Sequence, residues 1–151
     1  MLRKLALVLA SAALFAASSK PNFSGKWRLD EARSSREAPA ALVETIDHRE
    51  PAVRIDSDWD HNVATGVSNA GLLAPAMRLT TDGTDATSAM PMGMSLVTKS
   101  HWDGDRLVTE WRVNGLEQPL SGTWTRYLTG PNTMVVEAVA GQVREKLVFG
   151  K

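Results

Sequence analysis

Residues 107–113 read LVTEWRV, and their regular alternation decides the fold class. In an extended chain the odd-numbered side chains of this stretch point to one face and the even-numbered side chains point to the other. The odd-numbered face is mainly apolar, whereas the even-numbered face carries the charged residues Glu110 and Arg112. This period of two predicts a strand with one buried face and one solvated face, as in antiparallel sheets.

The same period of two continues outward in both directions. Residues 23–29, 53–60 and 143–149 alternate in this way, and in the last stretch we expect Val143, Leu147 and Phe149 on one buried face. Turn-forming residues separate the runs at intervals suited to hairpins: Glu50-Pro51, Asp82-Gly83, Asp103-Gly104, Gly130-Pro131-Asn132 and Ala140-Gly141. Residues 30–42 have some helical composition, but Pro39 interrupts them, so we expect a loop with at most one helical turn.

These runs and turns predict about eight to ten antiparallel strands, most of them paired with their neighbours in sequence. An open sheet of that size would expose two edges, and closure into a barrel removes them. We therefore predict an all-β fold, an up-and-down antiparallel β-barrel, with a two-sheet β-sandwich as the alternative. Residues 62–75 are small, polar and glycine-containing, and they form either a long loop or a weak strand flanked by loop.

The N-terminus has the layout of a secretory signal peptide. Arg3 and Lys4 precede an uncharged apolar run, residues 5–17, and the small residues Ser18 and Ser19 follow it. That run is shorter than the ~20 residues that a membrane-spanning helix needs. We expect cleavage of a signal peptide at residues 1–19, a single domain over residues 20–151, and a periplasmic or extracellular location.

The composition excludes several classes of protein. The 17 Lys plus Arg and the 17 Asp plus Glu are interspersed, so we expect no nucleic-acid partner and no polybasic membrane binding. The chain has no cysteine, which excludes disulfides, thiolate nucleophiles and cysteine-ligated metals. Because the signal peptide would take Arg3 and Lys4 with it, the remaining domain is slightly acidic and depends on its core alone for stability.

One short motif occurs near both ends of the domain. Phe23-Ser24-Gly25-Lys26-Trp27 is echoed by Leu120-Ser121-Gly122-Thr123-Trp124. In each copy the glycine permits a bend or a close backbone approach, and we expect Trp27 and Trp124 to pack at the barrel ends. A first-strand Gly-x-Trp resembles that of the calycins, which include lipocalins, fatty-acid-binding proteins and avidins. Residues 102–110 also resemble the late hairpins of fatty-acid-binding proteins.

The calycin resemblance implies a lipocalin-like barrel that encloses a small apolar or amphipathic ligand. The chain departs from the fatty-acid-binding proteins in the spacing of one Arg–Tyr pair. Fatty-acid-binding proteins hold the ligand carboxylate with an Arg and a Tyr two positions apart on one inward face. In this chain Arg126 and Tyr127 are adjacent, and they must therefore point to opposite faces of their strand.

The candidate ligand-binding residues are large apolar side chains with one hydroxyl among them. Rigid aromatic rings bind apolar ligands at a small entropic cost, although the same tryptophans could instead fill the core. Inward hydroxyls at Ser57, Thr98, Ser100 and Thr109 favour a partly wet interior, because buried hydroxyls need partners or water. We assign the pocket to Trp59, Met77, Leu79, Met92, Trp102, Thr109 and Trp111.

Met90, Met92 and Met94 would share one face of an extended chain, where they could form an adaptable lid or a Cu(I) site. The sequence contains no Gly-x-Ser-x-Gly elbow, phosphate loop or metalloprotease helix motif, so we predict no enzymatic activity and no cofactor. We expect a monomer that binds a small hydrophobic molecule in its interior. The alternative is a filled-core structural or interaction domain of the cell envelope.

Overall fold

The computed structural model describes residues 19–36, 38–60 and 74–151. No helix in these three ranges is long and apolar enough to cross a membrane. The predicted signal peptide lies almost wholly outside the described residues, as does most of the segment 62–75. The described part of the chain contains ten strands: β1 (Gly25–Leu29), β2 (Val43–Arg49), β3 (Ala52–Asp58), β4 (Ala76–Thr80), β5 (Asp82–Ala89), β6 (Ser95–Asp103), β7 (Arg106–Asn114), β8 (Leu120–Gly130), β9 (Thr133–Ala140) and β10 (Val143–Gly150).

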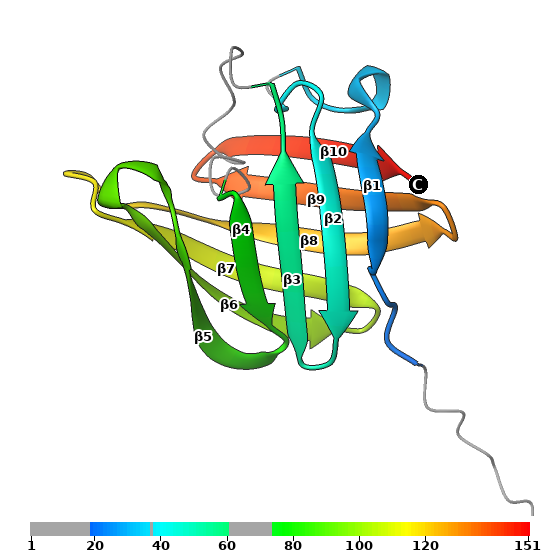
Figure 1. Ribbon diagram of the computed structural model, residues 1–151, viewed down its shortest axis with the longest axis horizontal. Helices are drawn as coiled ribbons and strands as arrows, with labels where there is room; N and C mark the ends of the chain where they lie inside the picture. The colour runs from blue at the N-terminus through cyan, green and yellow to red at the C-terminus, as the bar shows by residue number, and fades with distance from the viewer. Residues whose placement is uncertain (1–18, 37, 61–73) are drawn as a thin grey trace, which may run out of the picture.

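The strands form one antiparallel up-and-down sheet in the order β4-β3-β2-β1-β10-β9-β8-β7-β6-β5. In Figure 1 strands β1 to β4 form a front layer, and the later strands cross behind them. The first and last strands pair at Arg28 with Gly150 and at Leu29 with Phe149, which joins the two layers along one side. The fold is therefore a nearly closed calycin-like barrel, and the sequence-based prediction of strand number and topology is confirmed.

The residues after β1 extend this joint with β10. The backbone N–H of Asp30 donates to the Val148 carbonyl at 2.7 Å, and a short 3-10 turn, Glu31–Arg33, follows. The hydroxyl of Ser34 then accepts a hydrogen bond from the Val148 N–H, and the hydroxyl of Ser35 accepts one from the Lys146 N–H. The predicted single turn in residues 30–42 is confirmed, and the segment around it serves to close the barrel.

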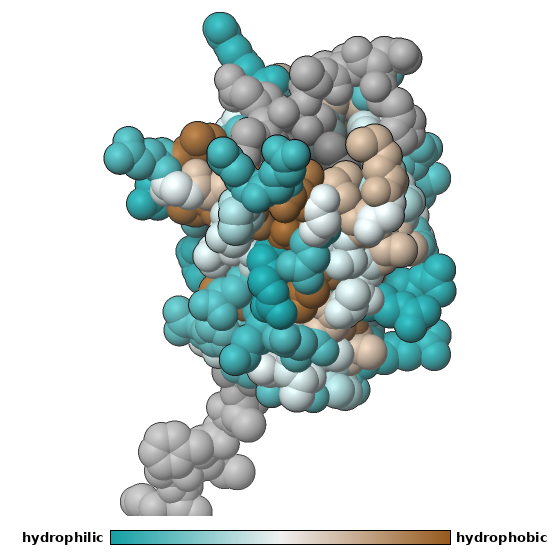
Figure 2. Space-filling model, turned by 90° about the vertical axis from the view of Figure 1, so that its left-hand side faces the viewer, coloured by the Kyte–Doolittle hydropathy of each residue, from teal (hydrophilic) through white to brown (hydrophobic). Residues whose placement is uncertain are grey.

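The other side of the barrel, between β4 and β5, has no backbone ladder. The turn predicted at Asp82-Gly83 is shifted: only Thr81 lies between β4 and β5, and Asp82 and Gly83 belong to β5. Gly83 has a φ of +81° where the register against β6 shifts, between Asp82 and Asp85. β4 and β5 do not pair as a hairpin. Side chains bridge the gap. The Arg78 N–H donates to the Ser88 hydroxyl at 2.9 Å, and the Thr98 hydroxyl donates to the Arg78 carbonyl at 3.2 Å. Figure 2 views this side of the molecule, where apolar residues show between hydrophilic ones.

The core fills the space between the two layers. Trp27, Trp111 and Trp124 are buried, and the rings of Trp111 and Trp124 stack with centroids 5.4 Å apart. Gly122 permits this packing, because a Cβ there would lie 2.3 Å from the Val139 carbonyl oxygen and 2.6 Å from the Trp111 ring. The close approach predicted for the Gly-x-Trp motif is thus confirmed at Gly122.

The face predicted for β10 needs one correction. Leu147 and Phe149 are buried, but Val143 is 46% exposed. Val143 is the first residue after the β9–β10 turn, so its side chain lies at the margin of the barrel, beyond the packed core. Two residues later the alternation places Glu145, a charged residue, in a buried position.

The methionine segment also differs from the extended chain that its spacing suggested. Residues Pro91–Gly93 form a 3-10 turn, and Met92 has a positive φ of 61°. Met90 and Met94 consequently pack against the core, whereas Met92 is 91% exposed. Because the chain turns here, the three thioether groups do not share one face.

Candidate functional site

The most unusual feature of the barrel interior is a buried ion pair. Glu44 extends inward from β2 and Arg126 from β8, and their side chains are 0% and 4% exposed. Nη1 of Arg126 donates to Oε2 of Glu44 at 2.6 Å, and Nη2 donates to Oε1 at 3.4 Å. The pair links the front layer to the back layer, and each charge is balanced by the other.

The residues around this pair are apolar except for Ser57. Nη1 of Arg126 also lies 3.3 Å from the Met134 sulfur, and the ladder places Leu107 and Val136 on either side of Arg126. On the opposite layer, Trp27 and Ser57 are the ladder partners of Glu44. Neither charged group could be left alone in such surroundings, because an unpaired buried charge costs several kcal/mol (roughly 3–5).

Two buried polar atoms of the interior have no hydrogen-bond partner within the described ranges. They are Oγ of Ser57 and Nε1 of Trp111. Other inward hydroxyls are satisfied: Ser100 and Thr109 bond to each other at 2.8 Å, and Thr98 donates to the backbone. Because the indole N–H is only a donor, Trp111 presents an unused donor inside the barrel. Such a group costs about 1–3 kcal/mol unless something accepts its hydrogen bond.

A second polar cluster, which we call the end cluster, lies at the end of the barrel where the N-terminal segment enters. It consists of Phe23, His48, Glu50, Thr81 and Trp102. The rings of Phe23 and His48 stack with centroids 5.6 Å apart, and those of Phe23 and Trp102 with centroids 5.9 Å apart. Nδ1 of His48 accepts the Phe23 N–H at 3.1 Å, so Nε2 carries the proton and donates to Glu50 at 2.8 Å.

Glu50 holds the end cluster together from its rim. Its carboxylate accepts hydrogen bonds from His48, from the Thr81 hydroxyl and, at 3.1 Å, from Nε1 of Trp102. Partial burial acts to raise the pKa of Glu50, but the hydrogen bonds from Thr81 and His48 outweigh it and lower that pKa below the usual value. The ionised carboxylate therefore joins the segment of His48 and Glu50 to Thr81 and Trp102, and Phe23 is attached to it through His48.

A lysine near each end of the described domain lies over the ring of a tryptophan. Nζ of Lys151 lies 4.9 Å from the centroid of the Trp27 ring, and Nζ of Lys20 lies 5.6 Å from that of Trp102. Nζ of Lys20 also donates to the Gly104 carbonyl at 2.7 Å. These contacts secure both termini of the described domain to the barrel.

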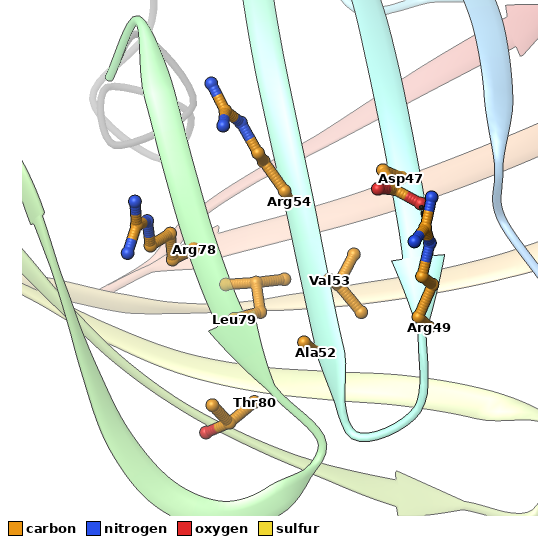
Figure 3. A pocket seen from close by; sticks show the side chains of 8 residues that line it. All are labelled: Asp47, Arg49, Ala52, Val53, Arg54, Arg78, Leu79 and Thr80. Carbon is orange, nitrogen blue, oxygen red and sulfur yellow. Dashed lines mark hydrogen bonds and ion pairs between the residues drawn. The ribbon is translucent and has the colours of Figure 1, made fainter.

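The outer face of β2, β3 and β4 holds a shallow groove of about 290 Å³. Figure 3 shows the side chains of Arg54 and Arg78 on neighbouring strands, with Arg49 and Asp47 on β2. Arg49 pairs with Asp47 at 3.0 Å, and Arg54 pairs with Asp56 at 3.3 Å. Since two of its three guanidinium groups already have carboxylate partners, this groove is not a strong anion site.

The seven predicted site residues fall into three groups. Met77, Leu79, Thr109 and Trp111 are buried on inward faces. Trp59 and Trp102 are partly buried against the core, Trp102 within the end cluster. Met92 points into solvent, away from the other six. Ligand binding by these residues remains a prediction.

Sequence reasoning missed Glu44, His48 and Glu50, and it left the inward face of β8 undecided. The available signal was the alternation of β2, where Glu44 and His48 share a face with the buried Ile46. For Arg126, the prediction that it and Tyr127 point oppositely is confirmed, because the Tyr127 hydroxyl bonds to Glu137 on the outer face. Which of the two faced inward depended on Glu44, which lies 82 residues away in sequence.

No family model matches the sequence, and no curated protein matches it either. Solved structures do match the fold. Lipid binding protein 8 of Caenorhabditis elegans, in its apo form, has a TM-score of 0.62 and 12% identity, over 85% of this chain and 94% of that chain. The REP1-NXSQ fatty acid transporter has a TM-score of 0.58 and 13% identity, over 85% and 94%. A variant of the fluorescent protein UnaG has a TM-score of 0.56 and 12% identity, over 85% and 95%.

Proposed function

We propose that this protein binds a small apolar or amphipathic molecule inside its barrel. The observation that carries the proposal is the inward-facing polar set of Glu44, Arg126, Ser57 and Trp111. Two buried atoms of this set, Oγ of Ser57 and Nε1 of Trp111, have no partner within the described part of the chain. A domain that needed only a stable core would gain little from this ion pair, since replacing a buried pair by well-packed apolar residues of similar volume is often neutral or stabilising. A ligand oxygen would satisfy the Trp111 N–H.

The fold and its side chains also support this proposal. Two of the similar structures are named as a fatty acid transporter and a lipid binding protein. Inside this barrel, Met77 and Met134 are buried and belong to the core cluster. Unbranched thioether side chains adapt to irregular shapes, so they could move to accommodate an apolar chain. The β4–β5 side, which is joined by side-chain hydrogen bonds alone, is the part of the sheet that separates at least cost.

The alternative is a filled-core interaction domain, and one observation favours it. The groove on β2–β4 opens on the outer surface, as do two further grooves, one on β6–β8 and one on β1–β3. The buried tryptophans occupy much of the interior. In that case partners would contact the outer faces of the sheet, and the interior would serve only for stability.

Titration of the purified protein with dodecanol and with a fluorescent fatty-acid analogue separates the two functions. Binding inside the barrel should change the emission of the buried Trp111 and Trp124, and it should saturate at one ligand per chain. Leu107→Trp, which fills space beside Arg126, should weaken binding, whereas Leu116→Trp on the exposed surface should leave it unchanged. If no ligand binds at high micromolar concentration, the interior has no binding function.

We propose further that the protein is exported. The support is the layout of residues 1–19 and the contact of Lys20 with Gly104, which makes the residue after the expected cleavage site part of the folded domain. In a bacterial host, we expect the periplasmic fraction to contain a chain that starts at Ser19 or Lys20. Leu7→Arg, which places a charge in the apolar run, should leave the chain unprocessed in the cytoplasm. An uncleaved chain in the wild type would contradict export by this route.

A further inference from the structure

Arg126 is the only cation among the buried residues of the described ranges. A guanidinium forms strong, charge-assisted hydrogen bonds with a carboxylate, so Arg126 is the group that a ligand carboxylate would be expected to bind. Both of its terminal nitrogens already point to Glu44, at 2.6 Å and 3.4 Å. An incoming carboxylate would either displace Glu44 or leave two anions beside one guanidinium. Each outcome places an unpaired negative charge in a buried site, which is strongly unfavourable.

The unused hydrogen-bonding capacity of the interior is of a different kind. Trp111 offers a neutral donor, and the Ser57 hydroxyl can donate or accept. Ser57 is also the ladder partner of Glu44, so it lies on the layer that already carries the negative charge. An uncharged ligand oxygen can accept from Trp111 without adding charge to the site.

We infer that the interior selects an uncharged amphipathic molecule, one with a hydroxyl or carbonyl oxygen at its polar end, over the carboxylate with the same apolar chain. The inference rests on the proposed function, since it concerns the ligand of the same interior. Glu44 is the residue that sets this selectivity: it neutralises the one guanidinium that would otherwise attract a carboxylate. Trp111 favours the uncharged oxygen, because its indole N–H can donate a hydrogen bond to that oxygen.

The test compares three ligands with the same chain length, dodecanol, methyl dodecanoate and dodecanoate, at pH 7.5, by calorimetric titration of the purified protein. We expect the alcohol and the ester to bind at least about tenfold more tightly than the carboxylate, the difference that one hydrogen bond or one unfavourable charge contact makes. Equal or tighter binding of dodecanoate overturns the inference and leaves the proposed function standing. Failure of all three ligands to bind removes the proposed function itself.

Two variants test the residues named. Glu44→Gln removes the negative charge and should reverse the order, so that dodecanoate binds more tightly than dodecanol. Trp111→Phe keeps an aromatic side chain, although a smaller one, and removes the N–H donor; it should reduce the preference for the alcohol without strengthening the binding of the carboxylate. Glu137→Gln changes a carboxylate on the outer face and should leave the order unchanged. If Glu44→Gln does not fold, the comparison in the wild type and in Trp111→Phe still decides the matter, because an unchanged preference in Trp111→Phe contradicts the role of the indole N–H.

Discussion

Glu44 and Arg126 each depend on the other, because both side chains are buried away from bulk solvent. Arg126→Leu alone leaves the Glu44 carboxylate buried without its partner, and we expect it to lower the free energy of unfolding by about 3–5 kcal/mol. The double variant Glu44→Leu/Arg126→Leu leaves no unpaired charge in the core and should recover most of that loss. Urea unfolding of the two single variants and the double variant measures the coupling. The exposed pair of Arg112 and Asp85 is the control, where Arg112→Leu should cost less than about 1 kcal/mol. A double variant as unstable as the sum of both single variants would contradict this dependence.

Glu50 predicts how the protein responds to acid. Because hydrogen bonds from Thr81 and His48 lower its pKa in the folded state, its contribution to stability is complete above the unfolded-state value of about 4.3. As the pH falls from there through the lower folded-state pKa, that contribution is lost. We therefore expect Glu50→Gln to reduce the decline in unfolding free energy below about pH 4.3. Thermal melts of both proteins from pH 7 to pH 3 measure this. Glu110→Gln, on an exposed strand face, is the control, and parallel curves for Glu50→Gln and wild type would contradict the prediction.

At the scale of elements, the weakest joint is the one between β4 and β5. Ser88 is buried, and its hydroxyl supplies the hydrogen bond to the Arg78 N–H that a backbone carbonyl would supply in a regular ladder. Ser88→Ala leaves that N–H unpaired, which should cost about 1–3 kcal/mol. The Arg78 amide should also exchange its hydrogen faster, as NMR can measure. Thr87→Ala, on the exposed face of the same strand, should change neither quantity. Unchanged exchange at Arg78 would show that the gap is held by other contacts.

The alternation of side chains predicts the elements well because burial of one face is a local property. It placed Leu107, Thr109 and Trp111 correctly, and the turn at Asp103-Gly104 requires only a positive φ, which Gly104 adopts at 62°. Alternation does not predict the gap after β4, because a turn signal does not specify whether the strands that it connects stay paired. The turn itself lies at Thr81, and Asp82 and Gly83 belong to β5. Nor does it predict the charged interior. Glu44 occupies an apolar face only because Arg126 neutralises it from another strand, and such a pairing has no local signal.

For the whole molecule, stability depends on the joint between the first and last strands. Only two residue pairs connect β1 to β10, and the remaining closure comes from the segment after β1 and from Trp27. Trp27 is fully buried, donates from Nε1 to the Phe23 carbonyl at 2.8 Å, and is covered by Lys151. It thus contacts the N-terminal segment and the C-terminal residue at once. A ring of strands that closes through so few backbone bonds should open as a single unit when this contact is removed.

Trp27→Ala should therefore lower the free energy of unfolding by about 3–5 kcal/mol, the cost of removing a large buried aromatic side chain. The loss should be the same by circular dichroism, which reports the whole sheet, and by the fluorescence of the remaining tryptophans, which lie mostly on the later strands. Leu116→Ala, at a position 44% exposed, should change stability by less than about 0.5 kcal/mol. Two separate transitions in the Trp27 variant would mean that the front layer and the back layer unfold independently, as two packed sheets would. A near-neutral result would mean that the backbone pairs between β1 and β10 close the barrel without the indole.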